Sequence, residues 1–296
     1  MKRKSTFALF ALILSVLMTQ AQVGDHNTNE RSIFILNAEF RNRTEISPSF
    51  DSTGNARFIL VPEGTKSGIT IWQRSRITLN YMNKRIETKI SIQDVRPFGQ
   101  NDKTWLSNNG QAVSVHEAWA KFFLIRNQHR EFAVKMGRQE ISNPDGRLIW
   151  YKNWNNYGAA HDALMIECHN MKRKAEWQLG FSLNSFNGYG FAQLPKYRQM
   201  AYFNFTKKFG SFLTFHITDF FTTQERPTGL NAVYGKNSVG FNPIFNLGKL
   251  TLNSSFYYQH GSIPGISGSQ NVAAYIYSVN AWYKLRSVKF GVGHES

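Results

Sequence analysis

The chain has little of what disulfide-bonded, disordered or helical membrane proteins require. It contains one cysteine, Cys168, which excludes an internal disulfide and a cysteine-based zinc site. Charged residues make up 18% of the chain, which together with its many aromatics excludes a disordered chain or a solvated coiled coil. No apolar run reaches the roughly 18 residues that a membrane-spanning helix needs. A membrane protein built from several helices is therefore excluded as well.

What the chain has instead is a high aromatic content and a strongly basic balance. Aromatic residues make up 15% of its 296 residues, and the formal net charge is +16. Mean hydropathy is −0.39. This length leaves room for one large domain or a wide barrel.

Residues 1–21 have the pattern of a secretory signal peptide. Three basic residues at 2–4 precede an apolar stretch over 7–18, and small residues stand before an expected cleavage after Ala21. The apolar stretch is too short to anchor the protein in a membrane. The mature chain, 22–296, is therefore expected in an exported compartment.

From Ile33 onward, apolar and polar residues alternate, which places successive side chains on opposite faces of a strand. The clearest case is 175–186, where Trp177, Leu179 and Phe181 alternate with polar or small residues. About thirteen such segments occur, each close to the length a tilted strand needs to cross a bilayer. They are expected over 33–45, 69–81, 86–96, 113–124, 132–140, 160–169, 175–186, 199–207, 211–222, 233–246, 250–260, 272–284 and 288–296.

The connections between these segments alternate strictly between long and short. Outer-membrane barrels show this alternation because their periplasmic turns are tight and their outward loops are extended. The sequence thus predicts an all-β fold, an antiparallel up-and-down transmembrane β-barrel. The alternative is a soluble β protein in which the aromatic residues form the core.

The barrel domain, 22–296, is expected to be incomplete. Single-chain bacterial barrels have even strand numbers, whereas the segment that begins at Val288 is the thirteenth. We therefore expect this sequence to be a fragment of a larger barrel that lacks its carboxy-terminal strands.

One face of the predicted strands is apolar and the other carries charge. Slipping the 69–81 strand by one residue would point two arginines toward the hydrocarbon core of the membrane. This would cost about 2–4 kcal/mol for each arginine near the midplane. Aromatic residues near strand ends, such as Trp72 and the pair Phe220 and Phe221, are expected to form girdles at the two interfaces. The residues expected to line the lumen as the substrate pathway are Glu39, Arg41, Arg43, Arg74, Arg76, Lys89, Glu117, Lys121, Lys135, Arg138 and Arg147.

Three charged residues complicate this parity. Asp94, Arg96 and Arg138 fall on the face of the apolar residues, so either a bulge reverses the register or the strand has already left the hydrocarbon. Gly137 is a plausible bulge site, and in either case these residues are expected near the outer rim.

Several short motifs occur along the mature chain. They are Glu39-Phe40-Arg41-Asn42-Arg43, Gln73-Arg74-Ser75-Arg76, Gln93-Asp94-Val95-Arg96, His116-Glu117-Ala118-Trp119-Ala120, Gly137-Arg138-Gln139-Glu140 and Asp145-Gly146-Arg147-Leu148-Ile149, followed by Trp154, Gly158 and Asp162. Together they resemble the alginate-export family of outer-membrane channels, whereas His161 and Ala163 depart from the family pattern. The resemblance implies an eighteen-stranded barrel that passively exports a polyanionic polysaccharide through a lumen lined with arginine and lysine.

From the residues alone, interior cations would concentrate anions and repel cations. The expected function is therefore an outer-membrane channel for anionic polysaccharide or small organic anions. The alternative is that Glu39, Glu87 and Glu117 neutralise these cations and only rigidify the wall, as in a general porin or a structural or adhesive barrel.

The loop 141–159 is the most aromatic of the long loops. It holds Trp150, Tyr151, Trp154 and Tyr157 interleaved with basic residues. Either it folds inward as a constriction that stacks sugar rings, which we favour, or it packs as a loop facing lipopolysaccharide.

No catalytic motif, cofactor motif or recognisable metal set occurs, and Cys168 shares the lipid-facing parity of Leu164 and Ile166. We therefore expect no enzyme, no cofactor and no metal. An exported barrel meets no nucleic acid. The expected surroundings are outer-membrane lipid and lipopolysaccharide of a Gram-negative bacterium, together with periplasmic export partners.

Overall fold

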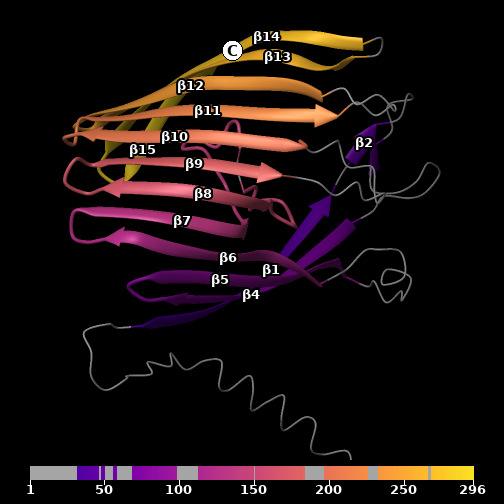
Figure 1. Ribbon diagram of the computed structural model, residues 1–296. Helices are drawn as coiled ribbons and strands as arrows, with labels where there is room; N and C mark the ends of the chain where they lie inside the picture. Colours follow the sequence, from indigo (N-terminus) through magenta and orange to yellow (C-terminus); the bar gives the residue numbers. More distant parts are fainter. Residues whose placement is uncertain are drawn as a thin grey trace, which may run out of the picture. The chain divides into compact units, whose positions relative to one another are not determined.

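The protein, seen here in a computed structural model, is built from antiparallel strands (Figure 1). The structure describes residues 32–46, 48–50, 56–58, 69–98, 113–149, 151–183, 197–225, 233–265 and 268–296. The predicted signal peptide, 1–21, and Trp150 lie outside these residues. Within them, no helix is both long enough and apolar enough to span a membrane.

Thirteen strands form one sheet in which each strand pairs with its neighbour in the chain, apart from a small hairpin. The predicted segments are confirmed, with ends that differ by a few residues. The strands of the sheet are β1 Ile33–Ile46, β4 Ile69–Met82, β5 Ile86–Pro97, β6 Val113–Arg126, β7 Arg130–Gln139, β8 His161–Asn170, β9 Ala175–Leu183, β10 Gln199–Phe209, β11 Leu213–Glu225, β12 Val233–Leu247, β13 Leu250–Gly265, β14 Gly268–Leu285 and β15 Val288–Glu295.

The hairpin of β2, Pro48–Phe50, and β3, Ala56–Phe58, lies in the long connection between β1 and β4. Strands of three residues are too short to show alternation, so the pattern does not predict them. The main sheet is open, since its order runs from β1 at one edge to β15 at the other. That further strands follow Ser296 stays a prediction.

The chain divides into two compact units. Unit 1 consists of Met1–Ala118 with Lys152–Ala159, and unit 2 consists of Trp119–Tyr151 with Ala160–Ser296. The connection 140–160 therefore contributes one segment to each unit.

In unit 1, the sheet has one apolar face and one charged face. Phe40 is 65% exposed, and Ile77 and Ile90 are likewise exposed although apolar. Arg74, on the opposite face, is only 2% exposed. The register predicted from alternation is therefore confirmed, with the arginines of β4 away from the apolar face.

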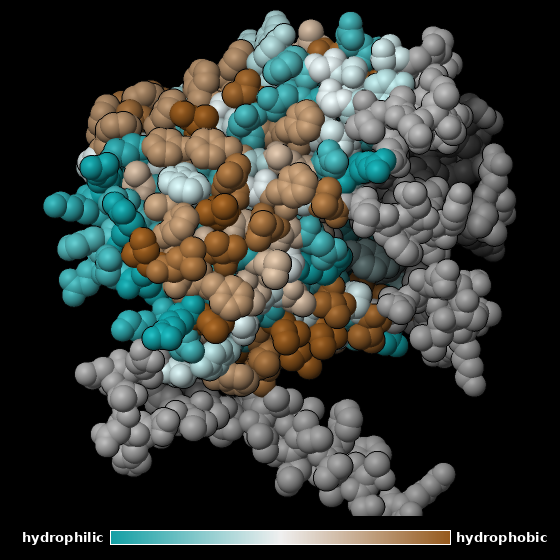
Figure 2. All heavy atoms as spheres, in the orientation of Figure 1, coloured by the Kyte–Doolittle hydropathy of each residue, from teal (hydrophilic) through white to brown (hydrophobic). Residues whose placement is uncertain are grey.

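Unit 2 shows the same division. On β9, Leu179 is 47% exposed, whereas its neighbour Gly180 and the hydroxyl residue Ser182 are buried. Figure 2 shows apolar residues spread over the visible face of these strands, with hydrophilic residues gathered at the end where the short turns lie. A face that exposes this much apolar surface fits lipid better than water.

Two aromatic residues differ from their predicted place in a girdle. Trp72 lies on the charged face of β4, where its ring meets that of Tyr157. Phe220 packs against the buried cluster that contains Met200 and Tyr202. The prediction is wrong for both, because alternation sets the face of a residue and aromatic character alone does not.

Three rings on the polar face of unit 2 lie over glycines of the neighbouring strand. A Cβ atom on Gly180 would stand 2.0 Å from the ring of Tyr202, its cross-strand partner. Gly240 and Tyr257 form the same arrangement, with 2.1 Å. A third pair is Gly291 and Trp282, with 2.2 Å. Each glycine leaves room for a ring to lie flat on the wall.

Candidate functional site

The candidate site is a cluster of four arginines on the charged face of unit 1. Arg41 and Arg43 project from β1, and Arg74 and Arg76 project from β4, because each pair is two residues apart in a strand. Arg41 lies directly opposite Arg74 in the register. Like charges opposite one another destabilise a sheet, so this arrangement requires compensating groups.

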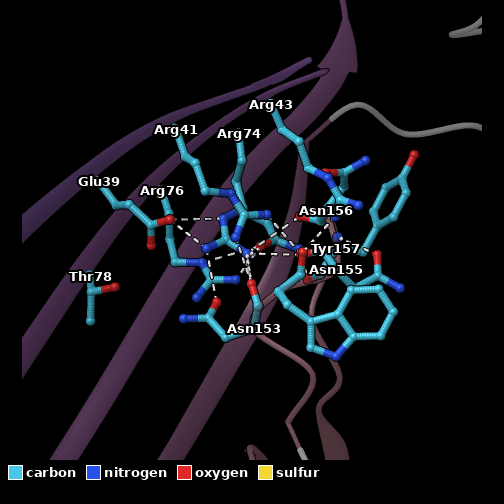
Figure 3. A network of polar contacts seen from close by, with 12 residues as sticks. Glu39, Arg41, Arg43, Arg74, Arg76, Thr78, Asn153, Asn155, Asn156 and Tyr157 are labelled. Atoms are coloured by element: carbon cyan, nitrogen blue, oxygen red, sulfur yellow. Dashed lines mark hydrogen bonds and ion pairs between the residues drawn. The ribbon is translucent and has the colours of Figure 1, made fainter. Parts of the chain in front are cut away.

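Backbone carbonyls of the segment 152–159 supply part of that compensation (Figure 3). Arg41 donates from Nη1 to the carbonyl of Asn153 at 2.6 Å and from Nη2 to the carbonyl of Asn155 at 2.8 Å. Arg43 donates from Nη1 to the carbonyl of Trp154 at 2.7 Å. These charge-assisted bonds hold the segment against the strands.

Arg74 is the most buried arginine of the cluster. Its Nε donates to Glu39 Oε1 at 3.0 Å, and its Nη2 also reaches this carboxylate. The same Nη2 donates to the side-chain oxygen of Asn153 at 2.8 Å. Burial of this guanidinium is therefore supported by a carboxylate and by the segment 152–159 together.

Arg76 connects to the segment through an amide side chain. It donates to Gln93 Oε1 from Nε at 3.2 Å and from Nη2 at 2.7 Å. Gln93 in turn donates from Nε2 to the carbonyl of Tyr157 at 2.9 Å. Gln93 thus links Arg76 to the loop through hydrogen bonds.

The end of the segment lies close to the wall. The rings of Tyr157 and Trp72 meet edge to face with centroids 6.3 Å apart. Burial raises the pKa of the Tyr157 phenol. Gly158 has a φ of 73°, and a Cβ there would stand 2.8 Å from His116 Cε1. Both its conformation and its surroundings therefore require glycine.

The cluster keeps a net positive charge. Among the described residues, the guanidinium groups of Arg41, Arg43 and Arg74 face two carboxylates, Glu39 and Glu45, the latter 3.0 Å from Arg43 Nε. The carbonyls of the segment carry no charge and do not neutralise the rest. Trp154, whose carbonyl is held by Arg43, is 57% exposed.

The lysines predicted to line the lumen have partners. In unit 1, Lys89 forms an ion pair with Glu117, while Glu87 has no ion pair among the described residues. In unit 2, Lys121 pairs with Glu167 at 2.6 Å. Also in unit 2, the ammonium of Lys135 lies 4.0 Å from the centre of the Trp119 ring.

Arg147 lies on the polar face of unit 2. It donates to Glu295 Oε1 at 2.5 Å and to Ser278 Oγ at 2.9 Å, joining the loop to β14 and β15. The bond to Glu295 raises the pKa of Arg147. The segment 141–149 is therefore held to the wall by a charged side chain.

Apolar packing and a second hydrogen bond hold the same segment. Ile141 and Ile149 are buried in one cluster with Met165 and Tyr202 of the strands. Asn143 donates from Nδ2 to the hydroxyl of Tyr257 at 3.1 Å. Its side-chain oxygen accepts from the backbone of the same loop.

Arg138 differs from its predicted placement in the lumen. The register of β7 with β8 continues without interruption past Gly137, so no bulge reverses it. Arg138 therefore shares the outward face with Met136, which is 60% exposed, and pairs with Asp162 at 3.4 Å. Here a carboxylate partner offsets the cost of a charge on this face.

Asp94 and Arg96 of β5 likewise form an ion pair on the outward face. The register of β4 with β5 also runs without a bulge, and the two side chains pair at 2.6 Å on the outward face. Both residues lie near the long-loop end of the strand. Of the two predicted alternatives, the structure therefore shows the unbroken register.

Sequence reasoning missed the partners that organise the site. Asn153, Gln93 and the carbonyls of 154–157 have no charge, and their proximity to the arginines depends on how a distant loop folds. Gly158 offered a signal, since glycine beside polar and aromatic residues often marks a required backbone shape.

Comparison with known proteins supports this architecture. Residues 45–184 match the alginate export family, which confirms the resemblance seen in the sequence. No curated protein matches the chain at a significant level.

Two solved structures share the fold. An anion-selective porin from Comamonas acidovorans has 11% identity and a TM-score of 0.52, with 88% of this chain and 78% of that chain covered. OmpF of Salmonella typhi, in complex with daunomycin, has 9% identity and a TM-score of 0.51, with 89% and 78% covered. At these identities the likeness shows the fold alone, that of an outer-membrane β-barrel porin.

Proposed function

We propose, from the match of residues 45–184 to the alginate export family and from the arginine cluster beneath 152–159, that the protein is an outer-membrane channel selective for anionic solutes. The preferred solutes are acidic polysaccharides or small organic anions. Transport is passive and involves no covalent chemistry. A secretory leader would direct the chain to this membrane.

The observation that carries this proposal is that the guanidinium groups of Arg41, Arg43 and Arg74 outnumber the carboxylates of Glu39 and Glu45 within the cluster. In a porin-type barrel the polar face lines the water-filled interior. Fixed cations in such an interior raise the local concentration of anions and lower that of cations. Because arginine stays ionised, this field persists over the whole physiological pH range.

The neighbourhood of the cluster favours an acidic sugar among the possible anions. A guanidinium group can bind a carboxylate through two parallel hydrogen bonds. Trp154, whose backbone carbonyl accepts from Arg43, is exposed, and an aromatic face is a platform for the apolar side of a sugar ring. A uronate unit carries both features, a carboxylate and a pyranose ring.

Reversal potentials in a planar bilayer across a KCl gradient test the proposal. The protein should prefer chloride to potassium, and the double variant Arg41→Gln and Arg43→Gln should lose part of that preference. Arg138→Gln is the control, because this arginine lies on the outward face. A preference for potassium, or equal reversal potentials for the double variant and the control, would overturn the proposal.

A general porin without strong selectivity is the second candidate, and the ion pairs favour it. Lys89 with Glu117 and Lys121 with Glu167 are neutral as pairs. If these pairs represent the whole wall, reversal potentials should lie near zero in the protein and in all variants. The absence of any conductance would indicate a structural or adhesive barrel instead.

A further inference from the structure

The short-turn edge of unit 2 is densely basic. The turns after β6, β8, β10, β12 and β14 all lie at the same ends of the strands, because the strands alternate in direction. The row of these turns is called the short-turn edge. At this edge Figure 2 shows hydrophilic residues gathered together. The cations of this basic edge are Arg126, Arg130, Lys172, Arg173, Lys174, Lys207, Lys208, Lys249, Lys284, Arg286 and Lys289.

The described carboxylates at this edge do not balance these cations. Glu131 is engaged by Arg126 at 3.0 Å, and Glu176 is engaged by His169 at 3.1 Å. In the part of unit 2 that the structure describes, Lys172, Lys249 and Lys284 form no ion pair. The basic edge therefore has a large excess of positive charge in contact with water.

Lys284 and Lys289 show how far this charge has been concentrated. They stand directly opposite one another on β14 and β15. Two like charges at such a position destabilise the strand pair unless an anion lies nearby. The ammonium of Lys289 also lies 4.7 Å from the centre of the Trp282 ring, so a cation and an aromatic face are presented together.

We propose that the basic edge captures a polyanionic carbohydrate chain from the side of the short turns before the chain enters the channel. This inference rests on the proposed function. In outer-membrane barrels the short turns face the periplasm, so capture there suits export. Many cations at one edge speed association with a polyanion and make its affinity fall with added salt.

The directions of these side chains favour binding of a carbohydrate chain at the channel entrance over binding of the headgroups of anionic phospholipid. Lys208 shares the face of the buried Thr206, and Lys284 and Lys289 share the face of Trp282 and Ser278. These are polar-face positions, which lipid does not reach. Lys207 takes the outward parity, but its ammonium donates to the carbonyl of Arg173.

Block of the channel current by oligogalacturonate, added to one side of a planar bilayer at a time, tests the inference. The direction in which the protein has inserted into the bilayer is determined with streptavidin, which binds a biotin attached at Ser287→Cys in a Cys168→Ala background. Block should begin faster from the short-turn side, and this rate should fall steeply as KCl is raised. Replacing Lys172, Arg173, Lys174, Lys284 and Lys289 with Gln should lower the rate about tenfold. The variant should still prefer chloride, because the arginine cluster of unit 1 is unchanged, and Arg138→Gln should leave both the block rate and the reversal potential unchanged.

The outcomes separate the two proposals. A wild-type protein that prefers potassium overturns the proposed function. A protein that prefers chloride but is blocked equally from both sides, or whose block is unaffected by the five-fold variant, overturns the capture inference alone. The inference also fails if the variant differs from wild type only in bilayers that contain phosphatidylglycerol, since the edge then binds lipid headgroups.

Discussion

The guanidinium group of Arg43 on β1 donates a 2.7 Å hydrogen bond to the backbone carbonyl of Trp154, a residue 111 positions away in the chain. Arg41 makes two bonds of the same kind to neighbouring carbonyls. Because a carbonyl accepts a hydrogen bond without neutralising the donor, these arginines anchor a loop segment and keep their charge. Anchoring and selectivity should therefore respond differently to substitution.

Comparing Arg43→Lys with Arg43→Gln separates the two roles. Lysine keeps the charge but lacks the planar fork, whereas glutamine loses the charge. Each should lose a charge-assisted bond of about 1.5–3 kcal/mol and speed amide hydrogen exchange in 152–159. Only the glutamine variant should shift the reversal potential. Exchange rates equal to those of wild type in both variants would show that Arg43 does not hold the segment.

Gly158→Ala should displace the end of the segment. The new Cβ would meet His116 at 2.8 Å, and the positive φ costs about 1–2 kcal/mol for a non-glycine residue. Gly210→Ala is the matched control, because Gly210 has a φ of 59° but no atom within 4 Å of the added Cβ. In urea unfolding in lipid vesicles, Gly158→Ala should lose more stability than the control. Equal losses would mean that the contact with His116 relaxes without cost.

Tyr257→Phe should loosen the segment 141–149 in unit 2. The change removes the hydroxyl that accepts from Asn143 and should cost about 1 kcal/mol. Trypsin cleavage after Arg147 should become faster as a result. Tyr258→Phe serves as the control, because Tyr258 is exposed on the opposite face of β13. The same cleavage rate for both variants would exclude a role for this bond.

Leu179→Arg and Gln178→Arg test the division of the wall into two faces. The first places a charge among the exposed apolar side chains of β9 and should cost about 2–4 kcal/mol if it lies near the bilayer midplane. The second places it on the polar face, near Glu167 across the strand pair, and should cost little. Reversible unfolding from lipid bilayers measures both. A larger loss for Gln178→Arg would reverse the assignment of the faces.

The sequence predicts the strands well because alternation is a local property with a single period. The residue that follows Arg74 must lie on the opposite face whatever the rest of the chain does. The outward placement of Arg138 follows from the same rule, and of the two alternatives predicted for it, the bulge at Gly137 is absent from the register of β7 with β8.

The arrangement of the site could be predicted only in part. Alternation places Arg41 and Arg74 on one face, and the resemblance to the alginate export family marks them as a group. Their partners come from the segment 152–159, whose path depends on long-range packing. Carbonyl acceptors leave no trace in the sequence, so a cluster predicted as free charge is in fact also an anchor.

The rings of Tyr202, Tyr257 and Trp282 each occupy the space left by a glycine on the adjacent strand. Replacing only the glycine creates a clash, and replacing only the ring leaves a notch in the wall. Each pair is therefore expected to change together during evolution, so that homologous barrels keep both members or exchange both at once.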